Sequence, residues 1–300
     1  TLATVEDLSQ PTRGPASRGR TPSPPGDAHT VADGARSAAR GSRVPGEARR
    51  ASRSPSAERP CAGAGDRRPI GVFDSGVGGL SVLRQIRLLL PAEDLCYLAD
   101  QAHVPYGRRP LEEVRRFAVG VVDWLLEREC KLIVVACNTA SAAALHPLRA
   151  AYPGVPFVGM EPAVKPAAEV TRSRIVGVLA TPATFRGELY RSVVGRFAAG
   201  IEVLEAPLPG LVERIEAGDL AGAETRRIIA DGVAPLRASG ADSIVLGCTH
   251  YPFVIDLIAE AAGPRVQVID PSGAVARQVA RLLVERGLTG RILARLEAEG

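Results

Sequence analysis

Two stretches of this sequence share one pattern, in which an apolar run ends at a cysteine that small or polar residues follow. The first is KLIVVACNTAS, residues 131–141, and the second is DSIVLGCTHYP, residues 242–252. Each pattern predicts a buried strand that runs into a helix, so Cys137 and Cys248 are expected where a strand ends. A single buried cysteine there is usually structural. Two cysteines in matching settings, 111 residues apart, indicate a shared role.

The repetition extends beyond the cysteines. PIGVFDSGVGGLSVL, from residue 69, resembles RIVGVLATPATFRGELY, from residue 174, and Gly71 and Gly177 within them are 106 residues apart. Such a constant offset indicates two similar units. Strands that alternate with helices and are apolar on both faces are typical of parallel sheets covered by helices. The predicted fold class is α/β, with two similar parallel-sheet domains related by pseudo-two-fold symmetry.

Composition separates an N-terminal extension from the rest of the chain. Residues 1–66 are rich in Arg, Pro, Ser, Gly and Ala without apolar periodicity, which predicts a disordered basic extension. The first α/β domain is expected to contain residues 67–160 together with 270–300, and the second residues 161–269. Residues 1–68 hold 12 arginines against 7 acidic residues, so the net charge of this segment is more positive than the +4 of the whole chain. The remaining residues are therefore close to neutral. A nearly neutral folded part argues against a nucleic-acid-binding core.

The five cysteines show none of the short paired spacings of a zinc site or of a CxxC redox motif. Their odd number favours reduced thiols over a disulfide framework. No apolar stretch approaches the ~20 residues of a membrane span, and the sequence does not start with a signal-peptide core. These features predict a soluble, cytoplasmic protein with no metal site and no membrane partner.

The chemistry of two facing thiols is specific. Ligands of parallel α/β folds bind at the carboxyl ends of the strands, so Cys137 and Cys248 would lie on opposite walls of one cleft. One thiol can then remove a proton from a carbon while the other returns a proton to the opposite face, which inverts a stereocentre without a cofactor. The reference pKa of a thiol, ~8.5, is within reach of neutral pH.

Polar neighbours strengthen this interpretation. Asp74 and Ser75 end the first predicted strand, and His250 follows Cys248 by two residues. Alone, such an Asp is usually a turn or cap residue, and a lone His is usually an ordinary surface or core group. Beside a thiol, Asp74 can adjust the proton affinity of Cys137, and His250 that of Cys248. The glycines of DSGVGG lack the lysine of a phosphate-binding loop and can bring N–H groups toward a carboxylate.

Five motifs in a fixed order resemble glutamate racemase of bacterial cell-wall synthesis, over residues 69 to about 285. They are GVFDSGVGGLSVL (71–83), ADQAHVPYG (99–107), ACNTASA (136–142), GMEPAVKPA (159–167) and GCTHYP (247–252). The resemblance implies a cofactor-independent isomerase that interconverts L- and D-glutamate and supplies D-glutamate for peptidoglycan synthesis, and thus for cell-wall biogenesis and cell shape. Glutamate is the implied partner, and the oligomeric state stays open, a homodimer included.

The resemblance also implies roles for individual residues. Cys137 and Cys248 match the two bases, the first acting on D-glutamate and the second on L-glutamate. Glu213, in APLPGLVERIEAG, matches a family glutamate beside the second cysteine and joins Asp74 and His250 in the catalytic set. The positions that match substrate-binding residues are Asp74, Ser75, Tyr106, Gly107, Asn138, Thr139, Thr249 and His250.

This chain departs from the family pattern at two places. Glu205 stands where the family usually has a cysteine, and Gly187 stands where a small hydroxyl residue is often found. Neither position is one of the two bases, so the departures affect the expected edges of the pocket and not the expected chemistry.

Three alternatives remain from the residues. Aspartate racemase and related two-cysteine isomerases typically place Glu after the second "CT", where this chain has His250. A binding module or regulator that keeps the fold, acting through the basic extension, would be favoured by loss of one cysteine, and both are present. A thiol redox protein would need a CxxC motif or a resolving partner cysteine, and the sequence offers neither.

Overall fold

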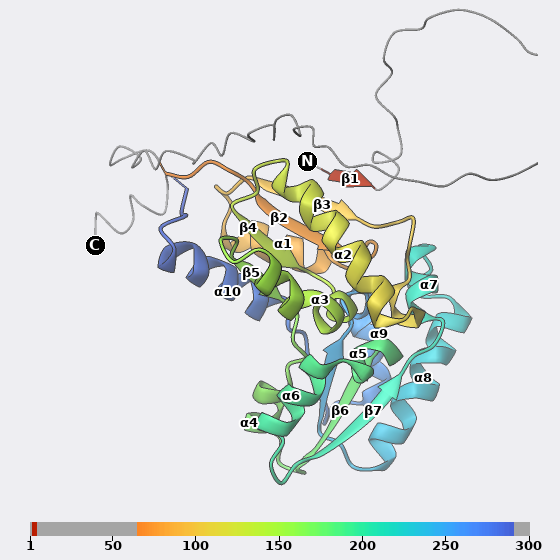
Figure 1. Ribbon diagram of the computed structural model, residues 1–300. Coiled ribbons are helices and arrows are strands. Elements are labelled where there is room, and N and C mark those ends of the chain that lie inside the picture. Colours follow the sequence, from red (N-terminus) through yellow and green to blue (C-terminus); the bar gives the residue numbers. More distant parts are fainter. Residues whose placement is uncertain (1, 5–64, 291–300) are drawn as a thin grey trace, which may run out of the picture. The chain divides into compact units, whose positions relative to one another are not determined.

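The computed structural model describes residues 2–4 and 65–290 (Figure 1). Most of the predicted N-terminal extension lies outside the described residues. The exceptions are residues 65–66 and β1 (Leu2–Thr4). β1 is a short strand that sequence analysis did not anticipate, and it pairs in parallel with β3 (Leu95–Ala99).

The first sheet is parallel throughout, with the described strands in the order β1-β3-β2-β4-β5. Helices cover both of its faces: α2 and α3 pack on one side, and α1 and α10 on the other. The bounds of these elements are β2 (Ile70–Asp74), α1 (Leu80–Leu89), η2 (Tyr106–Arg108), α2 (Leu111–Leu126), β4 (Leu132–Val135), α3 (Asn138–Ala151), β5 (Phe157–Gly159) and α10 (Ser272–Glu285).

The second sheet is also parallel, with the strand order β7-β6-β8-β9 among the described residues. Helices α7, α8 and α9 belong to the core on one face, and α4 and α6 to the core on the other. The bounds are α4 (Val164–Val170), β6 (Ile175–Ala180), α5 (Pro182–Arg186), α6 (Glu188–Phe197), β7 (Glu202–Pro207), α7 (Leu211–Glu216), α8 (Ala223–Ala238), β8 (Ser243–Gly247), η3 (Tyr251–Val254), α9 (Ile255–Ala262) and β9 (Gln267–Ile269). The prediction of two parallel-sheet α/β domains is confirmed.

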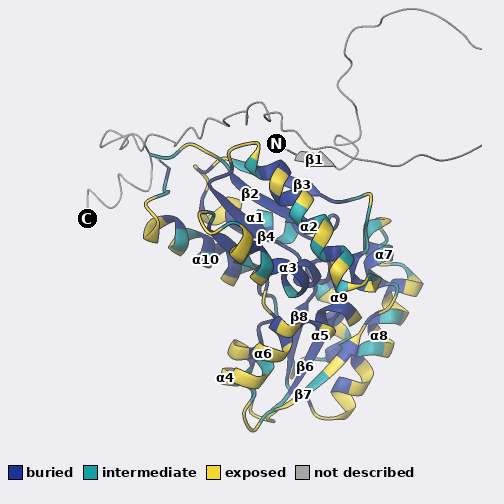
Figure 2. Cartoon of the chain, viewed as in Figure 1, coloured by how far each residue is buried: buried dark blue, intermediate teal, exposed yellow. Residues whose placement is uncertain are grey.

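Burial explains why these segments become strands and helices. The central strands β2, β4 and β8 are buried along their whole length, as continuous apolar runs in a doubly covered sheet require (Figure 2). Helix α2 follows Pro110 and has Glu112 and Glu113 in its first turn, where negative charge interacts favourably with the positive end of the helix dipole. Its buried side chains recur at helical spacing and face the sheet.

Helix α10 returns the chain to the first sheet. Its buried residues Val275, Val279 and Leu283 share a core with Ile70 and Val72 of β2. Residues 291–300, which the prediction also groups with the first domain, lie outside the described residues. The described residues 65–290 form one compact unit by their contacts, so the bounds between the two domains stay a prediction. None of the described helices is both long and apolar enough to cross a bilayer.

Candidate active site

The predicted site residues lie where the central strands end. Asp74 is the last residue of β2, Cys137 follows β4 by two positions, and Cys248 directly follows β8. Cys137 is also the N-cap of α3, where its sulfur accepts a hydrogen bond from the N–H of Ala140 at 3.4 Å. Because the strands are parallel, residues that are far apart in sequence lie together at the carboxyl ends of the strands.

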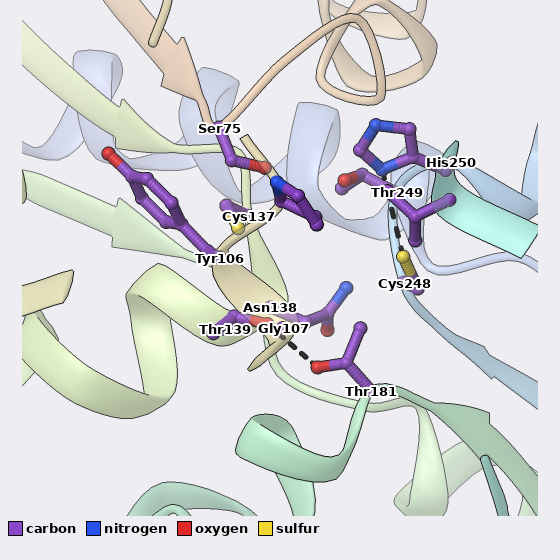
Figure 3. A pocket seen from close by; sticks show the side chains of 12 residues that line it. Ser75, Tyr106, Gly107, Cys137, Asn138, Thr139, Thr181, Cys248, Thr249 and His250 are labelled. Atoms are coloured by element: carbon purple, nitrogen blue, oxygen red, sulfur yellow. Dashed lines mark hydrogen bonds between the residues drawn. The ribbon is translucent and has the colours of Figure 1, made fainter. Parts of the chain in front are cut away.

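A small cavity, in part open to solvent, lies between these strand ends (Figure 3). Residues that follow strands of the first sheet and residues that follow strands of the second sheet both line this cavity, and the two cysteines are among them. Its lining residues are Ser75, Pro105, Tyr106, Gly107, Cys137, Asn138, Thr139, Thr181, Val212, Cys248, Thr249 and His250. Nine of the eleven residues predicted from the sequence are in this set. Of the other two, Asp74 is fully buried and contacts the lining residue Thr249, whose Oγ1 donates to its Oδ1 at 3.3 Å.

A carboxylate accompanies the first cysteine. Burial raises the pKa of the Cys137 thiol, and the negative charge of Asp74 raises it further, against the opposing hydrogen bond from Ala140. Burial also raises the pKa of Asp74, although the charge on His250 and the N–H groups of Gly76 and Gly79 oppose the shift. Cys137 is therefore held in its protonated form, as a proton donor.

A histidine accompanies the second cysteine. Nδ1 of His250 lies 3.7 Å from Sγ of Cys248, and Nε2 lies 2.5 Å from Oε1 of Glu216. Burial disfavours the imidazolium, but the hydrogen bonds to Cys248 and Glu216, and the charges of Cys248 and Asp74, outweigh it and raise the pKa of His250 to about 10. A protonated His250 stabilises negative charge on the neighbouring sulfur.

Glu216 stays ionised beside this histidine. Burial favours its neutral form, but hydrogen bonds from His250 and Gln101, the charge of His250 and the N–H of Val77 together lower its pKa. Nε2 of Gln101 donates to Oε2 at 3.1 Å, and the Val77 N–H donates to Oε1 at 2.8 Å. Cys248, His250 and Glu216 thus form a continuous polar chain.

Polar groups without protein partners face the same cavity. Both side-chain atoms of Asn138, Oδ1 and Nδ2, are buried and lack a hydrogen-bond partner. Thr139 shares hydrogen bonds with Thr181 at 2.9 Å and with Thr184 at 3.2 Å, which connects α3 to the start of α5. Buried polar groups need partners, so an amide left open in a cavity indicates a polar ligand.

Two predicted residues have contacts that the sequence did not indicate. The hydroxyl of Tyr106 donates to Asp100 Oδ2 and points away from the two cysteines, so the ring wall and not the hydroxyl borders the cavity (Figure 3). Glu213 does not line the cavity. Its Oε1 lies 2.5 Å from Nη2 of Arg108, as an ion pair, and the carboxylate that reaches His250 is Glu216.

Sequence reasoning missed four residues with a place at the site: Pro105, Thr181, Val212 and Glu216. The internal repeat contained a signal for Thr181, because the offset of 106 residues maps Ser75 onto it. Glu216 and Glu213 are three residues apart on α7, so helical spacing places both on neighbouring faces and cannot choose between them.

Comparison with known proteins gives a consistent assignment. The family model for Asp/Glu/Hydantoin racemase matches residues 70–279. A glutamate racemase of Roseiflexus sp. (strain RS-1) is 55% identical over 221 residues, which are 74% of this chain and 81% of the relative.

Solved structures agree. Glutamate racemase from Francisella tularensis subsp. tularensis SCHU S4, in complex with D-glutamate, is 33% identical with a TM-score of 0.67, over 75% of this chain and 84% of that one. Escherichia coli glutamate racemase, in complex with L-glutamate and the activator UDP-MurNAc-ala, is 35% identical with a TM-score of 0.67, over 72% of this chain and 83% of that one.

Proposed function

The chain belongs to the Asp/Glu/hydantoin racemase family, and we propose that it interconverts L- and D-glutamate without a cofactor, using Cys137 and Cys248 as the two bases. The observation that carries the proposal is the single cavity lined by both thiols, each with its own polar partner. The relatives named above, including structures with D- and L-glutamate bound, support glutamate as the substrate.

In the L-to-D direction, Cys248 acts as the thiolate. It takes the α-proton of L-glutamate, and the C–H electron pair remains on the α-carbon as a carbanion. Cys137 then delivers its thiol proton to the opposite face, which forms D-glutamate and leaves Cys137 as the thiolate. The neighbouring groups suit this direction, because Asp74 favours a Cys137 thiol and the raised pKa of His250 places a positive charge beside the Cys248 sulfur. The reverse reaction exchanges the two roles.

The other polar residues hold the substrate in this scheme. Ser75, Asn138, Thr139 and Thr249 offer hydroxyl and amide groups to the two carboxylates and the amino group, and none of them is a strong base that would compete for the α-proton. The N–H groups at the start of α3 add a partial positive charge near a carboxylate. Asp74 serves the Cys137 side, and His250, held by Glu216, serves the Cys248 side.

The biological role follows from the product. We propose a cytoplasmic enzyme that supplies D-glutamate for peptidoglycan synthesis, since the thiols must stay reduced to act as bases. A homodimer is compatible with this proposal.

Incubation with L-glutamate in D₂O tests the function. Proton NMR and chiral chromatography should show D-glutamate whose α-position carries deuterium, because the returned proton comes from a thiol that has exchanged with solvent. The reaction should need no added pyridoxal phosphate, nucleotide or metal, and EDTA should not inhibit it. Absence of racemisation would overturn the proposal, and faster turnover of aspartate would move the chain to the aspartate racemases.

Cysteine variants test the mechanism. Cys137→Ala and Cys248→Ala should each reduce racemisation by about 10³-fold or more, because each direction needs both a base and an acid. Circular dichroism should show that both variants remain folded. A folded variant with near-normal turnover would contradict the two-base scheme.

A further inference from the structure

The glycine-rich segment that joins β2 to α1, residues 75–79, packs directly on the group that serves Cys248. A Cβ on Gly76 would overlap the carboxylate of Glu216, and a Cβ on Gly78 would lie 2.5 Å from Nδ1 of His250. These glycines are therefore needed for close contact. We call residues 75–79 the glycine loop.

The same loop also supports the group that serves the other cysteine. The N–H groups of Gly76 and Gly79 donate to Oδ2 of Asp74 at 3.2 and 3.0 Å. Between them, the Val77 N–H donates to Oε1 of Glu216 at 2.8 Å. A displacement of the glycine loop would thus change the surroundings of both cysteines at once.

Tyr97 reaches this loop from the neighbouring strand. Its hydroxyl donates to the carbonyl oxygen of Gly76 at 2.7 Å, and its backbone pairs opposite Val72 within the first sheet. Gly79 leaves the space that the hydroxyl occupies, since a Cβ there would lie 2.7 Å from the Tyr97 oxygen. The tyrosine side chain is buried, so this contact joins the loop to a rigid part of the sheet.

Tyr97 remains a donor under all conditions in which the enzyme would work. Burial raises its pKa well above the usual value of tyrosine, and the negative charges of Asp74, Glu216 and Cys137 raise it further. It does not line the cavity, so it has no direct contact with a substrate. Any contribution to the reaction must act through the loop.

We propose that Tyr97 is a positioning residue that holds the glycine loop in register with both proton-transfer groups, Asp74 on one side and the Glu216–His250 pair on the other. The inference rests on the proposed function for its kinetic consequences. Its geometric content, that one buried hydroxyl orders the surroundings of both cysteines, is independent of the substrate.

Tyr97→Phe tests the proposal, because it removes the hydroxyl and keeps the ring that fills the core. We expect kcat to fall by a similar factor in both directions, roughly three- to tenfold, as for the loss of one buried hydrogen bond. Asp74→Asn and His250→Asn should instead each bias one direction, the first the D-to-L direction and the second the L-to-D direction. A tyrosine that only fills the core would not produce the two-sided pattern.

The matched control is Tyr152→Phe, which removes an exposed hydroxyl that donates to Asp123 at 2.6 Å. It should leave kcat unchanged in both directions. Racemisation by Tyr97→Phe within twofold of the unsubstituted protein, or a loss confined to one direction, would overturn the positioning role.

Alkylation by iodoacetamide gives a second readout that needs no turnover. The rates at Cys137 and Cys248, followed by peptide mass spectrometry at one pH, should both rise threefold or more in Tyr97→Phe relative to Tyr152→Phe. An unchanged rate at either cysteine would overturn the proposal. If the unsubstituted protein failed to racemise glutamate, the proposed function would fall while this readout still tested Tyr97.

Discussion

At the scale of single residues, the two cysteines have the same side chain and opposite electrostatic surroundings. Cys137 lies near the carboxylate of Asp74, which opposes a thiolate, whereas Sγ of Cys248 lies 3.7 Å from Nδ1 of His250, whose own pKa is raised. Two bases in equal surroundings would both ionise or both stay protonated. The proposed proton exchange between two faces of a carbon needs one donor and one acceptor, and such unequal neighbours suit that requirement.

The choice between Glu213 and Glu216 can be tested directly. Glu216→Gln removes the charge that holds His250 and should lower kcat in the L-to-D direction, on the order of 10²-fold. Glu213→Gln breaks an ion pair that is partly open to solvent and should change kcat by less than about threefold. Steady-state kinetics in both directions decides, and a larger effect at Glu213 would favour the assignment made from the sequence.

The raised pKa of His250 predicts a pH dependence of stability. A group whose pKa is 6.5 when unfolded and about 10 when folded adds stability that is fully present below pH 6.5 and is lost as the pH rises toward 10. His250→Asn lacks this contribution at every pH. The difference in Tm between the two proteins should therefore be largest near pH 6 and shrink toward pH 10. A difference that grew with pH would show that His250 is held neutral.

At the scale of elements, the glycine loop shows what packing adds to a motif. Gly78→Ala would place a methyl group against His250 and should reduce racemisation at least tenfold, since the loop must shift to relieve the contact. Gly120 in α2 is a matched control, because a Cβ there meets nothing within 4 Å. Gly120→Ala should keep activity and raise Tm by a few degrees, through its better helix propensity. Equal activities would mean that the loop accommodates a side chain.

The elements themselves were accessible from the sequence. Apolar runs predicted the strands that end at or just before Asp74, Cys137 and Cys248, because burial on both faces of a parallel sheet leaves a clear local pattern. Helical spacing of apolar residues predicted the helices between them. Side-chain partners left no such pattern. Tyr97 reads as one apolar residue of a strand, and the preference of His250 for Glu216 over Glu213 depends on how α7 packs. Contacts between distant segments are set by tertiary packing, which local periodicity does not encode.

At the scale of the whole molecule, one buried ion pair joins the two ends of the described fold. Nζ of Lys131 donates to Glu93 at 2.6 Å and to the backbone oxygen of Asp66 at 2.7 Å, and its side chain is fully buried. The other oxygen of Glu93 accepts the N–H of Gly290 at 2.7 Å. Asp66 also donates its N–H to Thr289. Asp66 is therefore tied to both Lys131 and Thr289, and removal of a partner would leave a buried charge poorly satisfied.

Two truncated chains test where the fold begins. A chain that starts at Gly65 keeps the Asp66 carbonyl that Lys131 needs, whereas one that starts at Arg67 loses it. Loss of a buried hydrogen-bond acceptor costs about 1–3 kcal/mol. At ~2–4 °C per kcal/mol for a chain of this size, the shorter chain should melt several degrees lower. Both should keep kcat, because neither cut removes a residue that lines the cavity.

Within the longer chain, Asp66→Asn keeps the carbonyl and weakens only the Arg68 ion pair, so its Tm should stay close to the parent. Calorimetry on the three proteins separates these effects, and equal melting of the two truncated chains would show that Lys131 does not depend on Asp66.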